Sequence, residues 1–338
     1  MGVDIADIVP SDRKRLEDLK GRTVAIDAFN AIYQFLAIIR QPDGTPLRDL
    51  KGRTTSHLSG LIYRNSNLLQ MGIRPVYVFD GEPPKLKSAT IAARSATRRE
   101  AEKEWKEALA AGDLEKARIK ASRSSRLSQG MVDQSKELLT LLGIPHVQAP
   151  GEGEAQASDM TRKGDVWATA SQDFDSLLFG APRLVRNLTI SGRRRGPGGA
   201  YVETVPELVS LDSTLDRLQI TREQLVGMAI LVGTDFNEGI RGVGPKKALM
   251  LIRKHSDVET VCEKEGFDIA NVQDIKDIFL EPAVVDEYTL NWSDPDEEGT
   301  VSYLRDEFDF SEERVRKALK KISEGRSLAR QKSLDQWF

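Results

Sequence analysis

The sequence predicts an α/β fold in which a central, mostly parallel and twisted sheet carries helices on both faces. Short apolar runs typical of buried strands, such as residues 23–26 and 75–79, alternate along the chain with stretches of helical apolar spacing. An acidic residue falls at or just beyond the end of three such runs, as Asp27, Asp80 and Asp173. Because the carboxyl ends of parallel strands meet at one edge of an open α/β sheet, these acids are expected to share one crevice.

The bulk composition indicates a globular protein and excludes several classes. The 338 residues, of which 39% are hydrophobic and 30% charged, suffice for one large domain or two modest ones. The net charge of −3 gives no overall basic character, so any nucleic-acid surface must come from local patches. A single cysteine, Cys262, excludes a disulfide scaffold and suits a reducing compartment, and three scattered histidines offer no zinc site. No apolar run is long enough to predict a membrane span.

The first part of the chain supplies two strands and two helices. Residues 23–26 are expected to form the first strand, and the apolar spacing of residues 30–40 predicts the helix after it. Residues 54–71 have the pattern of a second amphipathic helix. The second strand, residues 75–79, ends at Asp80, and a glycine and two prolines then break the chain.

Residues 85–130 differ from the rest of the chain because they are polar, favour helix and contain few large apolar side chains. Between residues 82 and 130 there are 12 Lys or Arg against 7 Asp or Glu, a local balance of +5. Gly112 interrupts the segment, which predicts two helices. A helix that is polar nearly all round buries no core face. The segment is therefore either a solvated or partly disordered hairpin, or a basic arch over a substrate channel.

The following segment continues the alternation of strands and helices. Residues 132–142 are predicted to form a helix that ends at a glycine. Residues 144–147, 166–170 and 184–190 are predicted to be strands, and the glycine-rich residues 193–199 a loop.

Two acidic pairs lie in this segment. Glu152 and Glu154 stand where a helix should begin, and carboxylates are favourable at the positive end of a helix dipole. Asp173 and Asp175 are two residues apart, a spacing that on extended backbone puts both side chains on one face. Two unit charges about 4 Å apart interact by roughly 4 kcal/mol at an effective dielectric near 20, so a cluster of these acids needs a cation. Hard divalent cations prefer such oxygen ligands, although either pair alone is more typical of a helix cap or a solvated turn.

Two tight glycine turns follow an apolar helix predicted for residues 225–232. The turns at residues 239–244 precede Lys246 and Lys247, and exposed backbone N–H groups at such a helix start bind phosphate. An ATP-binding loop would need Lys directly after its last glycine, where this chain has Pro245, and that function is rejected. The alternative is a plain connection between two helices.

The C-terminal part carries less information. Residues 263–300 are acidic and irregular and suggest no function, whereas residues 311–327 have the pattern of an amphipathic helix with basic positions. The last residues, 331–338, are too few and too polar to pack as an element, yet they end in Trp337 and Phe338. Two large apolar side chains at a chain end indicate either a partner's pocket or a tail folded back on its own domain.

Six motifs, in order and over nearly the whole chain, resemble those of the structure-specific 5′ nucleases, and most closely of the flap endonucleases. They are VAIDAF (24–29), YVFDGEPP (77–84), APGEGEA (149–155), SQDFDSL (171–177), GTDF (233–236) and GIRGVGPKKAL (239–249). The tail is similar to the sliding-clamp (PCNA) binding motif of that family, with Gln331, Leu334, Trp337 and Phe338 at its positions. Since no long basic tail follows, the chain resembles the archaeal members.

The resemblance implies a role for each matching residue. The first metal site would be formed by Asp27, Asp80, Glu152 and Glu154. The second would be formed by Asp173, Asp175 and Asp235. Lys87 and Arg94 would polarise the scissile phosphate from the base of the arch, residues 85–130, and Tyr33 would stack on a nucleobase. The glycine turns would hold duplex backbone as a helix–two-turn–helix through Gly242, Gly244, Lys246 and Lys247.

The resemblance also implies an activity and its partners. The chain is expected to remove 5′ flaps from branched DNA by two-metal phosphodiester hydrolysis, with 5′–3′ exonuclease side activity, in replication and repair. Two Mg²⁺ ions, replaceable by Mn²⁺, and a K⁺ at the glycine turns would be its cofactors. The protein would be a cytoplasmic, nucleoid-associated monomer that binds the clamp and no membrane. The alternatives are a 5′ exonuclease or junction resolvase of the same superfamily, a phosphatase, and a non-catalytic clamp-tethered DNA-binding protein.

We expect four regions along the chain. They are an N-terminal nuclease region (1–98), an internal nuclease region (99–258), a C-terminal helical extension (259–328) and a clamp-binding tail (329–338).

Overall fold

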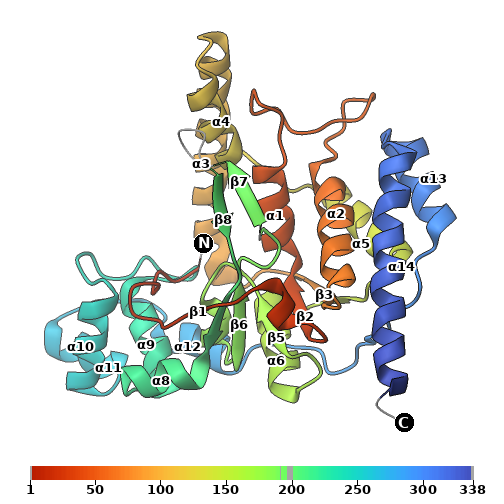
Figure 1. The fold of residues 1–338 in the computed structure, drawn as a ribbon. Coiled ribbons are helices and arrows are strands. Elements are labelled where there is room, and N and C mark those ends of the chain that lie inside the picture. Colours follow the sequence, from red (N-terminus) through yellow and green to blue (C-terminus); the bar gives the residue numbers. More distant parts are fainter. Residues whose placement is uncertain (1, 191, 196–200, 336–338) are drawn as a thin grey trace.

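The computed structural model describes residues 2–190, 192–195 and 201–335, except for the side chains of residues 193–195, 201–202 and 327–335. A seven-stranded sheet forms the centre (Figure 1). Its strands, in spatial order, are β1 (Asp12–Arg13), β9 (Glu207–Ser210), β6 (Arg183–Arg186), β5 (Ala168–Ala170), β2 (Thr23–Asp27), β3 (Arg74–Phe79) and β4 (His146–Gln148). The five strands from β6 to β4 are parallel, and β9 and β1 are added antiparallel at one edge. The predicted mostly parallel sheet is confirmed.

The two central strands show why the sheet is buried on both faces. In β2 and β3 the paired residues run from Thr23 opposite Arg74 to Asp27 opposite Val78. Side chains alternate between the faces of a sheet, and apolar residues at every position therefore serve two cores. Ile26 and Tyr77 pack into the core on one face, while Ala25 and Val76 belong to the core on the other.

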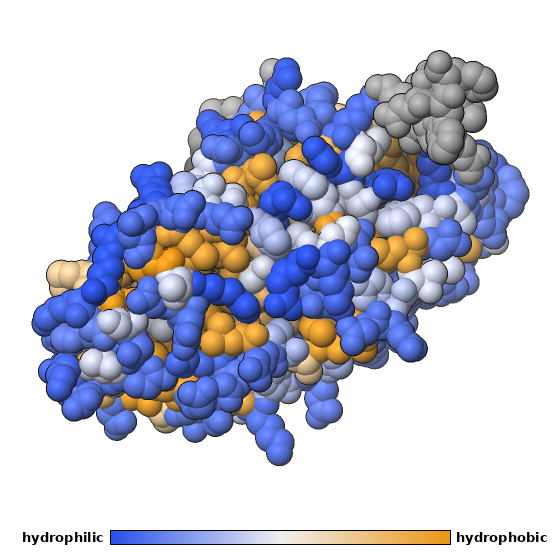
Figure 2. Space-filling view, turned by 90° about the horizontal axis from the view of Figure 1, so that it is seen from below, coloured by the Kyte–Doolittle hydropathy of each residue, from blue (hydrophilic) through white to orange (hydrophobic). Residues whose placement is uncertain are grey.

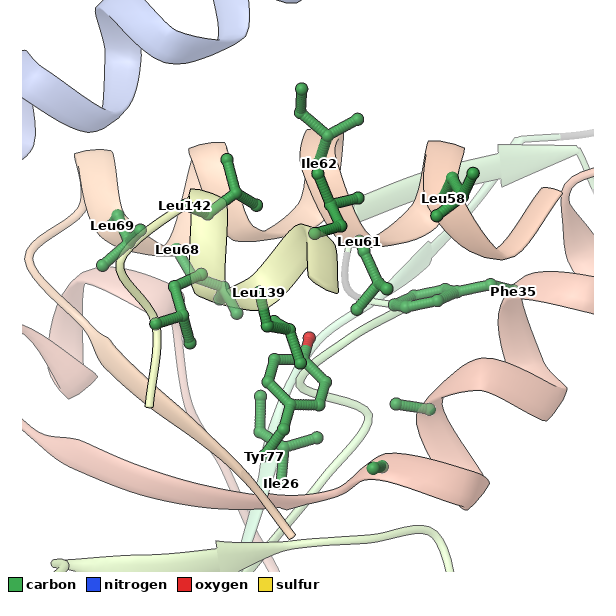
Figure 3. Packing of buried hydrophobic residues seen from close by; sticks show 14 of the residues in the cluster. Ile26, Phe35, Leu58, Leu61, Ile62, Leu68, Leu69, Tyr77, Leu139 and Leu142 are labelled. Atoms are coloured by element: carbon green, nitrogen blue, oxygen red, sulfur yellow. The ribbon is translucent and has the colours of Figure 1, made fainter. Parts of the chain in front are cut away.

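Five helices cover the first face (Figure 1). They are α1 (Ala28–Ile38), α2 (Ser56–Gln70), α5 (Gln129–Leu141), α13 (Glu297–Phe308) and α14 (Glu312–Asp335). Figure 3 shows Ile26 and Tyr77 rising from their strands toward Leu61 of α2 and Leu139 of α5. These large apolar side chains are fully buried, so this face holds a substantial part of the hydrophobic stabilisation.

The opposite face is covered by α6 (Gly153–Lys163) and by an extended segment, residues 281–296. The segment crosses the start of β3, where Trp292 Nε1 donates to the Pro75 carbonyl at 2.9 Å, and its Val285 exchanges two hydrogen bonds with the Gln156 amide. The expectation that residues 263–300 are irregular is wrong for α12 (Val272–Leu280) and for the start of α13. The extended segment 281–296 has a packing role that the sequence did not indicate.

A group of short helices continues this face beside α7 (Asp175–Leu178). It comprises α8 (Leu211–Leu218), α9 (Arg222–Val232), α10 (Pro245–His255), α11 (Val258–Glu265) and α12 (Val272–Leu280). Nearby, the predicted loop after β6 is in part a hairpin, of β7 (Gly192–Arg195) and β8 (Tyr201–Thr204), and β6 itself ends at Arg186 rather than at residue 190. The hairpin was missed because glycine and arginine are poor strand signals.

The basic insertion forms the predicted pair of helices, α3 (Ser88–Ala110) and α4 (Leu114–Arg123), which stand above the sheet edge (Figure 1). Gly112 makes the turn between them with a φ of 74°, a conformation that glycine adopts readily. Only small residues such as Ala108 and Ala117 are buried between the two helices, as their polar composition requires. Two short 3₁₀ turns, η1 (Leu16–Leu19) and η2 (Lys85–Lys87), complete the elements.

Helix α14 extends to Asp335, so the prediction that the tail forms no element is wrong for the backbone of residues 331–335. Gln331 and Leu334 lie on this helix, while Trp337 and Phe338 lie outside the described residues. Among the described residues, no helix is long and apolar enough to span a bilayer.

Candidate active site

All seven predicted metal-site acids line one cleft at the carboxyl edge of the sheet. The cleft has a volume of about 700 Å³, and its walls also include Lys87, Arg94 and Tyr33. The acids are Asp27, Asp80, Glu152, Glu154, Asp173, Asp175 and Asp235. The prediction that acids from separate segments meet in one crevice is confirmed.

Asp27 and Asp80 follow neighbouring strands and are fixed by backbone hydrogen bonds. Asp27 caps α1, where its carboxylate accepts from the Asn30 backbone N–H at 3.0 Å. The carboxylate of Asp80 accepts from the Gly153 backbone N–H at 2.7 Å. A Cβ at residue 153 would lie only 2.6 Å from Asp80 Oδ1, which explains the glycine between the two glutamates. Strand β3 is thereby joined to the start of α6.

Glu152 and Glu154 occupy the start of α6, as predicted. Glu152 is the N-cap residue, and Glu154 stands in the first turn, where the helix dipole favours negative charge. The Ser176 hydroxyl donates to Glu154 Oε1 at 3.1 Å, which orients this carboxylate toward α7.

Asp173 and Asp175 come together in a way that differs from the prediction. Instead of extended backbone, Asp173 lies in a bend and Asp175 is the first residue of α7. The Asn30 side-chain amide donates to Asp173 at 3.3 Å, and the Val3 backbone N–H donates to Asp175 at 2.8 Å. Neither Asn30 nor Val3 was predicted from the sequence, because both contacts join segments far apart in the chain.

Asp235 is presented by a tight turn between α9 and α10. The backbone N–H of Thr234 donates to the Asn237 carbonyl at 3.0 Å, and the Asn237 amide donates to the Ile230 carbonyl at 2.8 Å. The intervening Asp235 is buried and forms ion pairs with Lys87 and Arg94 from the base of α3. Lys87 also forms an ion pair with Glu152. These two cations are the predicted basic pair, and both lie within the acidic cleft.

Burial and mutual repulsion set the protonation of the acids. Burial, and then the charge of Glu152, raises the pKa of Asp80 to about 7. Burial, and then the charge of Asp173, raises the pKa of Asp175 to about 7. The pKa values of Asp27 and Glu154 are raised in the same way, first by burial and then by the charges of Asp80 and Asp175, respectively. Acids that repel each other in this way form a site for positive charge.

For Lys87, the neighbouring charges favour the ionised form of the side chain, whereas for the acids they oppose it. Burial alone would lower the pKa of its ammonium group, but Glu152 and Asp235 outweigh burial and raise the pKa above its ordinary value. Lys87 is therefore a permanent cation in the cleft.

The donor set fits divalent cations. Hard ions such as Mg²⁺ take oxygen ligands and keep several waters, so that a few carboxylates per ion suffice. Within the described parts of the chain, no three His, Cys, Asp or Glu side chains already stand in a metal-binding arrangement. Instead, protein groups engage the acids: Lys87, Arg94 and the backbone N–H groups of Asn30, Gly153 and Val3.

The aromatic residue of the cleft is Tyr33, on α1. The Arg98 guanidinium lies over its ring, 4.6 Å from the ring centre. One wall of the cleft therefore combines a flat aromatic face with a cation from α3.

The predicted glycine turns lie between α9 and α10. Gly239 and Gly242 adopt φ values of 72° and 81°, which favour glycine, and Gly244 caps α10. Lys246 and Lys247 are exposed in the first turn of α10. A helix start with two lysines is a surface suited to phosphate.

Comparison with known proteins assigns the chain to a family. Residues 5–101 match the XPG N-terminal domain, and residues 143–235 match the XPG I-region. Flap endonuclease 1 of Pyrococcus horikoshii is 54% identical over 340 residues, which cover 100% of this chain and 98% of the relative. Flap endonuclease 1 of Archaeoglobus fulgidus is 51% identical over 339 residues, with both chains covered completely.

A solved structure agrees with this assignment. Flap endonuclease-1 from Methanococcus jannaschii superimposes with a TM-score of 0.77 at 46% identity, covering 95% of this chain and 98% of that one. These relatives match the whole length and the fold together, and on that evidence the chain belongs to the flap endonuclease family of divalent-metal-dependent nucleases.

Proposed function

We propose that this protein is a structure-specific endonuclease that removes 5′ flaps from branched DNA, in replication and repair. One observation carries the proposal: seven carboxylates and the two cations Lys87 and Arg94 line a single cleft beneath the arch. Hydrolysis of a phosphodiester requires stabilisation of negative charge on the attacking and leaving oxygens, and this cleft is built to gather positive charge.

The acids divide into two groups that would hold two Mg²⁺ ions, with Mn²⁺ as a substitute. Asp27, Asp80, Glu152 and Glu154 would serve the first ion; Asp173, Asp175 and Asp235 would serve the second. When bound, such a pair of ions offsets the charge that develops on the reacting oxygens. The protein holds the acids for this purpose through backbone and hydroxyl donors, so that they keep their positions despite their mutual repulsion.

Lys87 and Arg94 act on the scissile phosphate from the base of α3. Both are held by Asp235, and Lys87 also by Glu152, so that two donors point into the cleft before DNA binds. Charge-assisted hydrogen bonds from fixed donors to a phosphate strengthen as negative charge grows on it.

The remaining predicted residues position the DNA. The Tyr33 ring would stack on the nucleobase next to the scissile bond, and the arch of residues 85–130 would enclose the flap. Gly242, Gly244, Lys246 and Lys247 would hold duplex backbone, with a K⁺ at the turn. Since these groups contact phosphate rather than base edges, selection would depend on the shape of the DNA and not on its sequence.

The tail and the wider organisation complete the proposal. The tail would bind a sliding clamp (PCNA) through Gln331, Leu334, Trp337 and Phe338. The protein would act as a monomeric nuclease at the nucleoid in the cytoplasm. Residues 1–98 and 99–258 would form the nuclease, 259–328 its helical extension and 329–338 the clamp-binding tail. A 5′–3′ exonuclease side activity would use the same cleft.

The test compares three labelled DNAs: a double flap, a four-way junction and a blunt duplex. With Mg²⁺, the wild type should cut the double flap once at the junction and leave a 5′-phosphate. EDTA should abolish the cut. The Asp175→Asn variant keeps an oxygen that can accept from the Val3 N–H. Its cleavage rate should fall by orders of magnitude, while it still binds DNA. Preferred cutting of the four-way junction would identify a resolvase instead, and tight binding without cleavage would identify a non-catalytic binder.

A further inference from the structure

The sheet edge opposite the active site carries a row of arginines and tryptophans. Four adjacent strands, β6, β5, β2 and β3, begin at this edge, and the row stands at or just before their first residues. Arg183 is the first residue of β6, Trp167 directly precedes β5, Arg22 directly precedes β2, and Arg74 is the first residue of β3. Trp292 of the segment 281–296 lies next to Arg74. We call these five residues the arginine–tryptophan row.

Each arginine of the row is stacked on an indole. Arg22 and Arg183 lie over the Trp167 ring, with the guanidinium carbons 5.0 and 5.4 Å from its centre. The Arg74 guanidinium lies 5.1 Å from the centre of the Trp292 ring. Arginine stacks on aromatic faces in this way and keeps its outer N–H groups available for other partners.

Backbone contacts hold the row in place. The Trp167 N–H donates to the Thr23 carbonyl at 2.8 Å, and the Arg74 N–H donates to the Arg22 carbonyl at 2.9 Å. Arg183 Nε donates to the Trp167 carbonyl at 2.7 Å. Neighbouring strands lie about 4.8 Å apart, so the row extends over about 14 Å across four strands.

The arginines of the row have no carboxylate paired with them. In residues 2–190, 192 and 203–326, whose side chains the structure describes, no ion pair joins Arg22, Arg74 or Arg183 to a carboxylate. The chain has more acidic than basic residues overall, and several of its other surface cations have carboxylates nearby. Arg22 and Arg74 are exposed, and Figure 2 looks onto this side of the molecule, where hydrophilic surface surrounds smaller apolar areas. Three guanidiniums held on a rigid edge in this way form a site for an extended anion.

We propose that the arginine–tryptophan row is a second nucleic-acid site, which binds the phosphate backbone of a DNA segment other than the one in the active-site cleft. The indoles are covered by the guanidiniums, so the row contacts phosphates rather than stacking on bases. Planar guanidiniums match phosphate oxygens in a two-pronged geometry. Phosphates follow one another every 3.4 Å along each strand of a duplex, so a row of about 14 Å meets several of them. Binding of DNA at this second site does not require cleavage in the active-site cleft.

The experiment counts DNA segments per protein. Protein in EDTA at low salt is first saturated with unlabelled double-flap DNA, and a fluorescent blunt duplex is then titrated in. The wild type, already saturated with flap DNA, should bind the duplex as a second DNA segment, and we call this event the second step. On a double-logarithmic plot, the affinity of the second step should fall with salt concentration with a slope of about −3, for three phosphate contacts. Because Trp167 lies under two of the arginines, the second step should also change the indole fluorescence.

Three triple variants separate the explanations. The first variant combines Arg22→Gln, Arg74→Gln and Arg183→Gln, and it should remove the second step and leave flap cleavage unchanged. The second combines Arg22→Lys, Arg74→Lys and Arg183→Lys, which keeps the charge and should retain the step. The matched control combines Arg217→Gln, Lys264→Gln and Lys317→Gln at exposed positions elsewhere; it removes equal charge and should bind the duplex as the wild type does.

The proposal is overturned if the wild type shows no second step, or if the Gln variant retains it in full. Equal loss in the matched control would also overturn it, because the effect would then reflect net charge alone. If the Gln variant fails to fold, as judged by lost flap cleavage, the Lys variant and the indole signal of the wild type decide the question. Binding of the second duplex without any change in indole fluorescence would place the DNA elsewhere.

Discussion

Lys87 Nζ lies 3.5 Å from Asp235 Oδ2, which joins the base of the arch to the loop between α9 and α10. Arg94, further along α3, forms an ion pair with the same aspartate, and Lys87 reaches Glu152 on its other side. The three segments that surround the proposed scissile phosphate are therefore connected through ion pairs in the cleft itself. The position of the arch and the electrostatics of the site depend on the same residues.

Replacing Lys87 tests this connection. Lys87→Met keeps most of the length of the side chain but removes the cation, so it should lower the single-turnover cleavage rate by about 100- to 1,000-fold. Flap DNA affinity should change much less, since many other contacts hold the DNA. The control is Lys85→Met, an exposed lysine of the same short turn. A drop in affinity without a drop in rate would move Lys87 from the chemistry to DNA binding.

The repulsion among the acids predicts an unusual gain of stability. Burial, and then Asp175 and Asp27, disfavour the charged form of Glu154. In EDTA, at a pH alkaline enough to ionise this carboxyl group, Glu154→Gln should therefore raise the free energy of unfolding by an amount on the order of 1 kcal/mol, because it removes one repelling charge. The stabilisation gained on adding Mg²⁺ should become smaller. Urea denaturation measures both quantities, with the exposed Glu313→Gln as a neutral control. A destabilised variant in EDTA would contradict the repulsion.

Much of the site followed from local patterns. The apolar runs at residues 23–26 and 75–79 each end at an acid, and the ends of parallel strands must meet at one edge of their sheet. The sequence alone therefore predicts that Asp27 and Asp80 lie close together. The Asp235 segment was recognised only through its resemblance to a family, because a turn between helices has no position fixed by sequence alone.

The features that were not predicted depend on contacts between distant segments. The support of Asp175 by Val3 and of Asp173 by Asn30 has no local signal. The segment 281–296 lacks apolar periodicity, since a single extended strand of chain buries only isolated residues such as Trp292. The arginine–tryptophan row is likewise invisible in the sequence, because its members are brought together by parallel strand pairing and by the packing of segment 281–296 on β3.

The lysines at the start of α10 predict a salt effect. Lys246→Gln together with Lys247→Gln should weaken flap DNA binding and reduce the salt slope of the affinity by about 2, one for each lost phosphate contact. The cleavage rate of bound substrate should stay the same, because neither lysine lines the cleft. The control is Lys254→Gln in the last turn of the same helix, where the lysine is paired with Glu265. An unchanged slope in the double variant would exclude α10 from the DNA contact.

His57 predicts how stability depends on pH. It is fully buried, and burial lowers its pKa to about 4, although a hydrogen bond at 2.9 Å joins it to Gln134. The unfolded chain takes up this proton near pH 6.5, so the stability should fall as the pH drops below about 6.5 and reach its full loss near pH 4. The loss should be about 3 kcal/mol. Urea midpoints of wild type and His57→Leu across this range test it, and equal slopes in both would assign the titration to another group.

The surroundings of two helical glycines predict that their changes to alanine have opposite effects on the free energy of unfolding. A Cβ on Gly325 would collide with the Leu69 carbonyl oxygen, which belongs to rigid backbone. Gly325→Ala should therefore lower the free energy of unfolding by about 1–3 kcal/mol, since the helices must separate. A Cβ on Gly130, in the first turn of α5, meets nothing closer than 4.0 Å, and its change to alanine should stabilise the fold by about 0.4–1 kcal/mol. Urea denaturation of both variants measures the difference, and a neutral Gly325→Ala would mean that α14 can shift away from α2 without loss.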